Sequence, residues 1–522
     1  MTVEVYYGPV TSFVRTENPA AITFLTQLLT VHGVDGNGGN YFIPFFNTVQ
    51  STILTGHLPY VESQLRRYGF DCKVFNSPFP VVGLPEPPDN LLATVQEPNF
   101  RPYPFQLTTA RKMIALGRGN VQIGTGGGKT ETFILAMRYL EHLLGRPIKS
   151  LTLTNVDNLA EQMVGRMTRR GLTGVTQFAS GKIKSNHIVS VVNGFHAAMK
   201  AGNSAVLEHL ATADVFCCDE SHHVQSSMNF DVGLACNAYY RWGLSATLYG
   251  NVANPFSHPD DMRIMGVTGP VIAHLPFRFL RDNGYVPDPE ITFIPCDQPK
   301  SSFKQNVFGR SVDTGIWRGS GFRGSETGIE NDLIVTNPFR NEMIRRLVYW
   351  TLQQEAESKF VILVVRKDHA ALLQKILWSC GVYSICSLGS RKVITIDQKG
   401  KQHTWKDSDN KMLADFTDGK QRVMIGTQKF DEGQSIPDFS DLILAQAGKG
   451  GESQRRVFQR VGRSLHTKTG RKPRVYDFFD MTHHMVQHQS QTRYEALNRE
   501  GYPVRISCPP HIFWPLENFP TI

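Results

Sequence analysis

The first stretch that could do chemistry is a glycine-rich turn that leads into Lys129 and Thr130. Val121 and Ile123 alternate before the turn as in a short buried strand, and apolar residues recur at helical spacing over residues 131–140. This order predicts a phosphate-binding loop, because glycines let backbone N–H groups approach phosphate oxygens and the helix N-terminus adds a positive dipole end. Lys129 would meet the β- and γ-phosphates and Thr130 would bind Mg²⁺. The residues predicted to hold ATP here are Gly124, Thr125, Gly126, Gly127, Gly128, Lys129 and Thr130. The alternative is a glycine-rich hairpin that only happens to precede Lys-Thr.

Two adjacent carboxylates, Asp219 and Glu220, follow an apolar run over residues 215–218. Buried charge at the end of a strand costs several kcal/mol, roughly, unless a cation lies beside it. Mg²⁺ on Asp219 would remove that cost, and Glu220 could then orient and polarise an attacking water. An acidic turn after a strand is the alternative, which the upstream phosphate loop disfavours.

Polar residues also follow other predicted strands. Asn155 comes after a strand at 151–154 and Asn193 after a strand at 188–192, where parallel sheets bind their ligands. Ser245 and Thr247 flank one small residue, as expected where two sites are coupled through close packing. Upstream, the amide of Gln106 could contact an adenine edge, and a plain surface glutamine is an equal alternative.

The elements that must position these residues alternate between strand and helix, which predicts parallel sheets covered by helices. The fold class is α/β, with two parallel-sheet domains in tandem after a small α/β N-terminal domain, in which a helix is expected over residues 20 to about 32. A long loop that could face DNA is expected over residues 297–330. The expected segments are a small domain that could bind DNA at 1–76, a Pro-rich linker at 77–94, the first sheet domain at 95–283, the second at 284–482 and a C-terminal extension at 483–522.

Residues 389–410 interrupt the alternation of the second domain. Residues 392–396 alternate, residues 397–401 supply turn residues and residues 402–405 can return, which predicts a β-hairpin with Gly400 near its turn. A decorative surface hairpin and a DNA-contacting element, such as a wedge at a fork, both remain open. In the second case the contacts would come from Lys392, Lys399, Lys401 and Trp405.

The composition constrains the partners only weakly. The 522 residues carry a formal charge of +9, which favours nucleic acid but is also found in mildly basic enzymes. The eight cysteines include no CxxC, which indicates reduced thiols in a cytoplasmic setting. Neither a signal peptide nor a membrane-spanning run is expected.

Taken together, these motifs resemble superfamily 2 helicases over about residues 95–480. The motifs are Gln106, Gly-Lys-Thr at 128–130, Asp-Glu-Ser-His at 219–222, Ser-Ala-Thr at 245–247, Thr427, Asp-Glu-Gly at 431–433 and Gln-Arg-Val-Gly-Arg at 459–463. Within that group the chain is most similar to the UvsW-type phage DNA helicases. The grounds are Asp-Glu-Ser-His-His at 219–223, Arg-Trp-Gly-Leu-Ser-Ala-Thr at 241–247, Asp-Asn-Gly-Tyr-Val at 282–286 and the small domain ahead of the motor.

The resemblance implies two RecA-like domains that clamp ATP and Mg²⁺ between them. Glu220 would be the general base, and Asp219 would hold the metal through its waters. From the second domain Gln459 and Arg463 would reach the γ-phosphate, Arg463 as an arginine finger. The further residues implied are Gly433 for ATP, then His222, Ser245 and Thr247 for coupling, then Asn155, Asn193, Arg366 and Thr427 for the nucleic-acid backbone.

The sequence departs from the family pattern at three places. Ile123 stands where the family prefers Ala or Gly, and Asn155-Val156 stand where a Pro-Thr pair is expected. His466 replaces a second arginine, and neutral histidine is a weaker phosphate partner. They put in question the start of the phosphate loop, one predicted contact with the nucleic-acid backbone and one predicted contact with the nucleotide phosphates.

The resemblance implies an ATP-dependent helicase or translocase on branched or forked DNA. Such a motor regresses forks, migrates Holliday junctions and unwinds D-loops or R-loops in replication, recombination or repair. A monomer in the cytoplasm is expected, which is the host cytoplasm if a phage encodes the chain. The alternatives are a motor subunit of a restriction system, an RNA helicase, and a catalytically silent nucleic-acid-binding scaffold.

Overall fold

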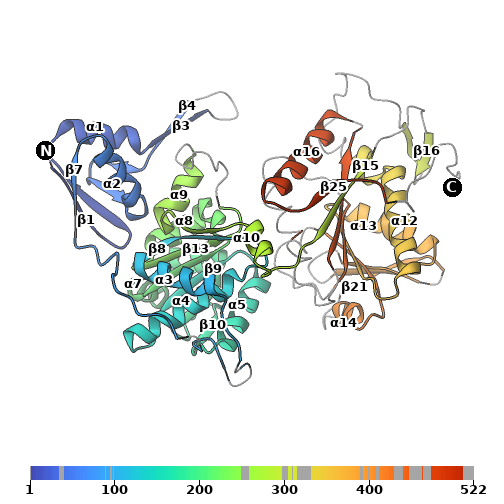
Figure 1. Ribbon diagram of the computed structural model, residues 1–522, viewed down its shortest axis with the longest axis horizontal. Coiled ribbons are helices and arrows are strands. Elements are labelled where there is room, and N and C mark those ends of the chain that lie inside the picture. Colours follow the sequence, from blue (N-terminus) through green and yellow to red (C-terminus); the bar gives the residue numbers. More distant parts are fainter. Residues whose placement is uncertain are drawn as a thin grey trace. The chain divides into compact units, whose positions relative to one another are not determined.

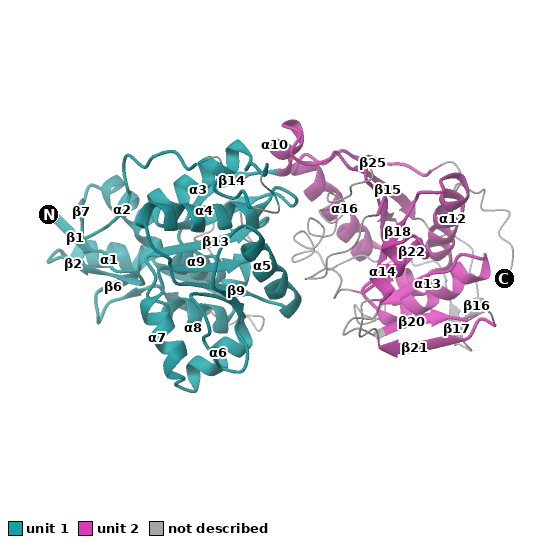
Figure 2. Cartoon of the chain, turned by 90° about the horizontal axis from the view of Figure 1, so that it is seen from below, with its two compact units in different colours: residues 1–276 teal, residues 277–522 magenta. Residues whose placement is uncertain are grey.

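The protein is described here as a computed structural model that divides into two compact units, residues 1–276 and 277–522 (Figure 2). The ranges described are 2–34, 40–88, 90–94, 97, 99–248, 258–296, 304–307, 310–313, 331–387, 392–397, 399–406, 411–427, 439–445, 461, 472–481 and 483–509. Three predicted ATP-site residues, Gly433, Gln459 and Arg463, lie outside these ranges, and only the backbone of Lys392 lies inside them. No helix in the described part of the chain is long and apolar enough to cross a membrane.

Unit 1 begins with a five-stranded sheet of order β5-β6-β2-β1-β7 (Figure 1). Its elements are β1 (Thr2–Tyr6), β2 (Thr11–Arg15), α1 (Pro19–Leu28), β5 (Phe46–Asn47), β6 (Thr52–Leu54), the 3-10 helix η1 (Thr55–His57), α2 (Leu58–Arg67) and β7 (Asp71–Phe75). Buried and exposed residues alternate along β1 and β2, so one face packs against the two helices. Asn18 caps α1 by accepting the Ala20 N–H at 3.0 Å, and Pro19 fits the first helical position.

The helix predicted over residues 20 to about 32 is too long. It ends at Leu28, and β3 (Thr30–Val34) pairs antiparallel with β4 (Asn40–Pro44). The β-branched pair Thr30 and Val31 favours an extended backbone, and Val31 is buried in the core of this sheet. Pairing with a strand further along the chain therefore overrides the local helical pattern.

The proline-rich segment after residue 76 packs against the rest of unit 1. The ring of Phe79 lies against Gly117 and Tyr240, and Tyr139 donates a hydrogen bond to the Pro85 carbonyl. The imidazole of His57 also contacts the Met262 carbonyl oxygen at 2.8 Å, so the N-terminal sheet is attached to the later part of unit 1. The domain boundaries at 76 and 94 remain predictions.

The larger sheet of unit 1 has the order β10-β11-β9-β12-β13-β8-β14, and all of its strand pairs are parallel. Its strands are β8 (Arg118–Ile123), β9 (Ser150–Thr154), β10 (Val175–Gln177), β11 (His187–Val191), β12 (Val215–Asp219), β13 (Tyr240–Ser245) and β14 (Val271–Leu275). Its helices are α3 (Pro104–Leu116), α4 (Lys129–Leu144), α5 (Asp157–Arg169), α6 (Val192–Lys200), α7 (Ser204–Thr212), the 3-10 helix η2 (Ser221–Gln225), α8 (Ser227–Ala235) and α9 (Pro259–Thr268). Both faces are covered, which explains continuous apolar runs such as that of β12.

Unit 2 holds a nine-stranded sheet of order β21-β20-β19-β22-β18-β23-β24-β15-β25. Its strands are β15 (Glu290–Cys296), β18 (Phe360–Leu363), β19 (Ile385–Ser387), β20 (Lys392–Ile396), β21 (Gln402–Lys406), β22 (Val423–Gly426), β23 (Asp441–Leu444), β24 (Arg474–Asp480) and β25 (Val504–Ile506). Its helices include α10 (Phe277–Asp282), α12 (Pro338–Gln354), α13 (Lys367–Ser379), α14 (Lys411–Thr417) and α16 (His484–Arg499). From β19 to β25 every pair is parallel, so the predicted α/β class with two parallel sheets in tandem is confirmed.

Two hairpins complete unit 2. The hairpin predicted over residues 392–406 is present as β20 and β21, which pair antiparallel from Lys392 with Lys406 to Ile396 with Gln402. Within the stretch expected to be one long loop, β16 (Lys304–Val307) and β17 (Arg310–Asp313) pair antiparallel, so that expectation is wrong for these residues. Each of these segments has one valine among three polar residues, which is too weak a signal to predict strands.

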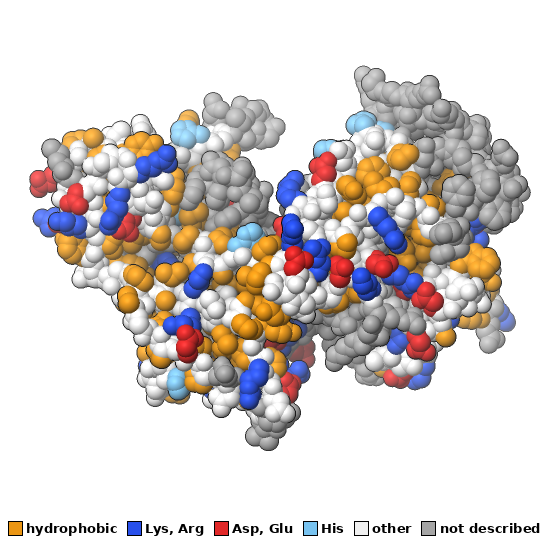
Figure 3. Space-filling view, viewed as in Figure 1, with side chains coloured by type: hydrophobic (Ala, Val, Ile, Leu, Met, Phe, Trp, Pro, Cys, Tyr) orange, Lys and Arg blue, Asp and Glu red, His pale blue; other side chains and the backbone are white. Residues whose placement is uncertain are grey.

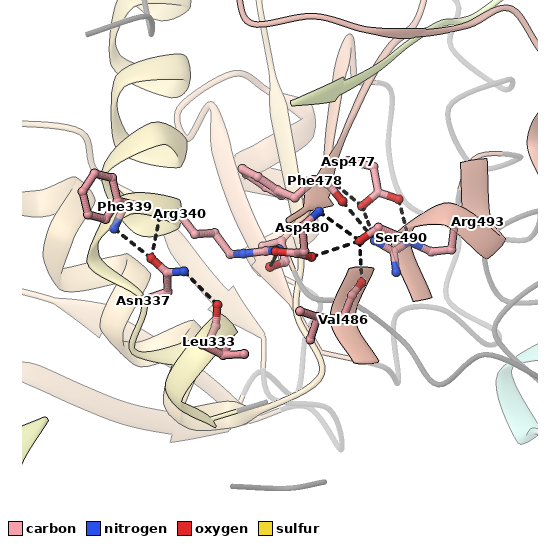
Figure 4. Close-up of polar contacts among 11 residues, drawn as sticks. Leu333, Asn337, Phe339, Arg340, Asp477, Phe478, Asp480, Val486, Ser490 and Arg493 are labelled. Carbon is pink, nitrogen blue, oxygen red and sulfur yellow. Dashed lines mark hydrogen bonds and ion pairs between the residues drawn. The ribbon is translucent and has the colours of Figure 1, made fainter. Parts of the chain in front are cut away.

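Buried charges attach α12 and α16 to β24 (Figure 4). Arg340 of α12 pairs with Asp480, which also accepts the Ser490 hydroxyl of α16 at 3.1 Å. One turn further along α16, Arg493 meets Asp477 at 2.8 and 3.0 Å. All five residues are at most 2% exposed, and each ion is compensated inside the unit.

Candidate nucleotide site and nucleic-acid edges

The predicted phosphate loop connects the end of β8 to the start of α4. Gly126 and Gly128 have φ of +85° and +77°, a left-handed backbone that other residues rarely adopt, and Gly128 caps α4. The loop is held by the Gly127 N–H on the Gly124 carbonyl at 3.1 Å and by the Gly124 N–H on the Leu275 carbonyl of β14 at 2.9 Å. The glycines thus shape a preformed turn at a helix N-terminus, which fits a phosphate chain.

Gln106 supports the loop from α3 and is only 3% exposed. Its amide nitrogen faces the Gly127 and Gly128 carbonyls at 3.4 Å, while its oxygen accepts the Tyr103 N–H at 2.9 Å. A Cβ at Gly128 would lie 2.5 Å from that nitrogen, so another residue there would displace the Gln106 amide as well as strain the backbone. Contact of Gln106 with an adenine edge remains a prediction.

The acid pair lies at the carboxyl end of β12, two strands from β8 in the sheet order. Burial and the neighbouring Glu220 carboxylate raise the pKa of Asp219 to about 6, although the Lys129 ammonium opposes this. Burial alone would raise the pKa of Glu220 as well, but the hydrogen bond from His222 and the charge of Lys129 lower it to about 2. A divalent cation binds the ionised carboxylate and would offset both the burial of Asp219 and its repulsion from Glu220, so Asp219 fits Mg²⁺ and Lys129 fits phosphate.

Glu220 has a left-handed backbone, with φ of +52° and ψ of 59°. Non-glycine residues persist in this region only where the surroundings hold them, and such positions cluster at functional sites. The carboxylate of Glu220 lies 3.3 Å from Nδ1 of His222 and 3.4 Å from Oγ of Ser245. Ser245 Oγ in turn accepts the Thr247 N–H at 3.2 Å, so the predicted base and the three predicted coupling residues form one cluster.

The predicted backbone contacts of unit 1 lie along the same edge of the sheet. β9 and β11 are paired neighbours, and Val191 is level with Thr154. Asn155 follows β9 directly, and Asn193 lies exposed in the first turn of α6, just after β11. Both therefore lie at the carboxyl edge to which β12 delivers Asp219.

The predicted contacts of unit 2 also share one carboxyl edge. β18 and β22 are parallel neighbours, Arg366 caps α13 after β18, and Thr427 follows β22. The Thr427 side chain is buried, and its N–H donates to the Ser387 carbonyl at 3.3 Å. On the face drawn in Figure 3, the described cationic and anionic side chains are interspersed and do not form a single basic patch.

The hairpin of unit 2 has one end at this edge and the other away from it. Trp405 pairs with Val393, and Val393 pairs with Ser387 on the next strand. Ser387 is level with Gly426, which stands just before Thr427. Adjacent strands lie about 4.8 Å apart, so Trp405 is on the order of 14 Å from Gly426 along one row. Its side chain is 36% exposed.

The turn of the hairpin lies away from the edge and packs on α13. A Cβ at Gly400 would lie 2.9 Å from the Trp378 ring, and Gln374 donates to the Ile394 carbonyl at 2.8 Å. Lys401 and the neighbouring Lys399 are on the order of 13 Å from Trp405 at ~3.3 Å per residue. The hairpin thus extends the sheet, and Trp405 alone of these three residues lies level with the carboxyl edge.

One buried polar group near the acid pair was not predicted from the sequence. Asn120 in β8 is fully buried and binds Ser221, the residue after Glu220, at 3.1 Å. An asparagine directly before the apolar pair Val121 and Ile123 was the available signal, because a buried amide requires partners.

Residues 99–250, which carry the phosphate loop and the acid pair, match the family model of the type III restriction enzyme res subunit. No curated protein matches the sequence. Among solved structures, yeast Dbp5 bound to RNA and ADP BeF3 is 16% identical with a TM-score of 0.50, and covers 78% of this chain and 89% of its own. The ATP-dependent type ISP restriction-modification enzyme LlaBIII bound to DNA is 13% identical with a TM-score of 0.52, over 77% of this chain and 31% of its own.

With the matched region at residues 99–250 and two parallel sheets in tandem, the chain resembles helicase-type, ATP-dependent nucleic-acid motors, and the resemblance to superfamily 2 helicases is confirmed. The chain is also similar to UvsW of bacteriophage T4, at 13% identity and a TM-score of 0.43, over 97% of this chain and 99% of that one.

Proposed function

We propose that this motor is a DNA helicase or translocase that acts on branched or forked DNA in replication, recombination or repair, as a monomer that uses ATP and Mg²⁺. The observation that carries the motor chemistry is the Glu220 cluster beside the phosphate loop. The lowered pKa keeps the Glu220 carboxylate ionised at neutral pH, and His222 and Ser245 hold it in place, which supports a role in orienting the attacking water. The choice of branched DNA rests on the motif resemblance, above all Asp-Glu-Ser-His-His at 219–223.

In this proposal the predicted nucleotide-site residues of unit 1 have separate tasks. The loop N–H groups and Lys129 bind the phosphates, and Thr130 and Asp219 hold Mg²⁺, which would neutralise phosphate charge when bound. Glu220 orients the attacking water and takes its proton. Gly433, Gln459 and Arg463 are proposed to complete the site from the second sheet domain.

The nucleic-acid track is proposed to follow the two carboxyl edges. Asn155 and Asn193 would contact the backbone from unit 1, and Arg366 and Thr427 from unit 2. Trp405 is proposed to stack on a base at the end of the second edge, because a half-exposed indole offers a flat apolar face. DNA contact by Lys392, Lys399 and Lys401 stays a prediction.

The test compares ATP hydrolysis with single-stranded DNA, duplex, a four-way junction and RNA of the same sequence at one salt concentration. The proposal expects the junction to stimulate hydrolysis most, and affinity to fall steeply with salt because phosphates are the main contact. Stimulation by RNA alone would overturn the DNA assignment, and equal stimulation by linear duplex and junction would overturn the branched-DNA assignment.

A motor subunit of a restriction system is the second candidate, favoured by the family match at residues 99–250 and the similarity to LlaBIII. In that case the chain would act on linear duplex DNA. Displacement of a triplex-forming strand from linear duplex, without migration of a four-way junction, would favour this candidate.

A further inference from the structure

Asn120 lies in the centre of the unit 1 sheet, and the roles proposed above do not use it. Its side chain is fully buried. The nitrogen donates to the Gly269 carbonyl at 2.6 Å, and the oxygen accepts the Ser221 hydroxyl at 3.1 Å. The Thr268 hydroxyl lies 3.1 Å from the same oxygen and 2.8 Å from the Ile264 carbonyl, and its one proton can serve either acceptor. The amide therefore ties β8 to the end of α9 and to the turn that follows Glu220.

The bond to Ser221 crosses a strand. In the sheet order β13 lies between β12 and β8, and Asn120, Gly243 and Cys218 occupy one row. A Cβ at Gly243 would lie 1.9 Å from the Asn120 oxygen and 2.8 Å from the Ser221 hydroxyl. Only glycine on the middle strand leaves room for Asn120 and Ser221 to meet over it.

The bond holds a strained position. Glu220, with φ of +52°, stands directly before Ser221, and Ser221 is fully buried. Two local bonds shape the same turn, from the Glu220 N–H to the Asp219 carboxylate at 3.2 Å and from the His223 N–H to the Glu220 carbonyl at 2.9 Å. Both of these local bonds lie within the turn. Among the described residues, the bond from Ser221 to Asn120 is what links this turn to β8, the strand that leads into the phosphate loop.

We propose that Asn120 is a positioning residue, which acts through Ser221 to hold Glu220 in its left-handed backbone and so to aim its carboxylate relative to the phosphate loop. This inference rests on the proposed role of Glu220 as the base. Asn120 itself touches no reacting atom. It should affect the rate of the chemical step and leave nucleotide binding, which depends on Lys129 and the loop, unchanged.

The chain offers a matched pair of variants to test this. The Ser221 and Thr268 hydroxyls lie at the same distance from the Asn120 oxygen, and both residues are fully buried. Only Ser221 adjoins Glu220, whereas the single proton of Thr268 can also go to the Ile264 carbonyl at 2.8 Å. Ser221→Ala should lower kcat about tenfold, a fraction of what a general base contributes, and leave KM for ATP and the affinity for a fluorescent ADP analogue within about twofold. Thr268→Val should lower the melting temperature about as much as Ser221→Ala does, and it should keep kcat within about twofold of wild type.

The outcomes separate the two proposals. Equal loss of kcat in both variants, or unchanged kcat in Ser221→Ala, would overturn the positioning role while wild-type hydrolysis still supports the motor. Wild-type protein that binds the ADP analogue but hydrolyses no ATP with any nucleic acid would overturn the base role of Glu220 and the inference with it. If Ser221→Ala does not fold, Ser221→Cys, a weaker donor of similar size, takes its place in the same comparison.

Discussion

The Nδ1 atom of His222 lies 3.2 Å from Oγ of Ser245, at the end of the neighbouring strand of the unit 1 sheet. The same nitrogen lies 3.3 Å from the Glu220 carboxylate, and the Ser245 hydroxyl faces both that carboxylate at 3.4 Å and the Thr247 carbonyl at 2.9 Å. A hydroxyl has one proton, so Ser245 can donate to only one of these acceptors at a time. The cluster can therefore exist in two hydrogen-bonded arrangements, one of which includes the predicted base.

This arrangement predicts that His222→Ala lowers the stimulation of ATP hydrolysis by DNA more than it lowers hydrolysis without DNA. Without the imidazole, Glu220 loses its charge-assisted partner but Lys129 remains. We expect the stimulation of ATP hydrolysis by DNA to fall about tenfold, as for the loss of a hydrogen bond worth roughly 1.5 kcal/mol, with KM for ATP nearly unchanged. Steady-state kinetics with and without DNA measure this, and undiminished stimulation would exclude a coupling role for His222.

The hairpin of unit 2 gives a prediction with its own control. Trp405 lies level with the carboxyl edge, while Lys399 and Lys401 lie near the turn that packs on α13. Trp405→Ala should weaken binding of single-stranded DNA by about 1–3 kcal/mol, as for the loss of one stacked base. The double variant Lys399→Ala/Lys401→Ala should bind within about twofold of wild type in a fluorescence anisotropy titration. If the lysine variant lost more affinity than Trp405→Ala, the DNA contact would lie at the turn and not at Trp405.

The buried His57 predicts a specific pH dependence. Burial lowers its pKa to about 4, and the Met262 carbonyl only partly opposes this. The unfolded chain takes up a proton near pH 6.5 but the folded chain does so only near pH 4, so the free energy of unfolding falls as pH drops between these values. The loss should reach on the order of 3 kcal/mol at pH 4.

His57→Gln tests this, because a glutamine amide can still donate to the Met262 carbonyl but does not titrate. Denaturant melts at pH 7, 5.5 and 4.5 should show a smaller loss of stability in the variant than in wild type. Identical pH slopes for the two proteins would mean that His57 is not responsible for the acid sensitivity.

The ion pairs of Figure 4 predict a large cost for removing one partner. Arg493→Met should destabilise unit 2 by about 3–5 kcal/mol, because it leaves the buried Asp477 carboxylate without its cation. Adding Asp477→Asn should restore much of the loss. Arg278, which pairs with Asp282 at 3.6 Å on the surface, is the exposed control, and Arg278→Met should melt close to wild type. Equal effects at the two sites would contradict the role of burial.

Local chemistry made much of this fold predictable. The strand before the phosphate loop, the helix beginning at Lys129 and the hairpin around Gly400 follow from apolar spacing and turn residues that lie close together in the sequence. The α/β class follows from the same alternation repeated along the chain.

The features that were missed depend on distant partners. The first helix ends early because Thr30 to Val34 pair with a strand beyond residue 39, which no local pattern reveals. Asn120 reaches Ser221 only because Gly243 occupies the strand between them, so its role depends on the register of three strands. Such relationships require the sheet order, which residue spacing alone does not determine.

The most direct test of the account is ATP hydrolysis by Lys129→Ala and Glu220→Gln, measured beside wild type with saturating DNA. Lys129→Ala should lose both nucleotide affinity and turnover, because it removes the phosphate charge. Glu220→Gln should bind an ADP analogue like wild type and lose about 10²-fold or more in kcat, because only the base is gone. If Glu220→Gln retained more than about a tenth of wild-type turnover, the assignment of Glu220 as the catalytic base would be contradicted.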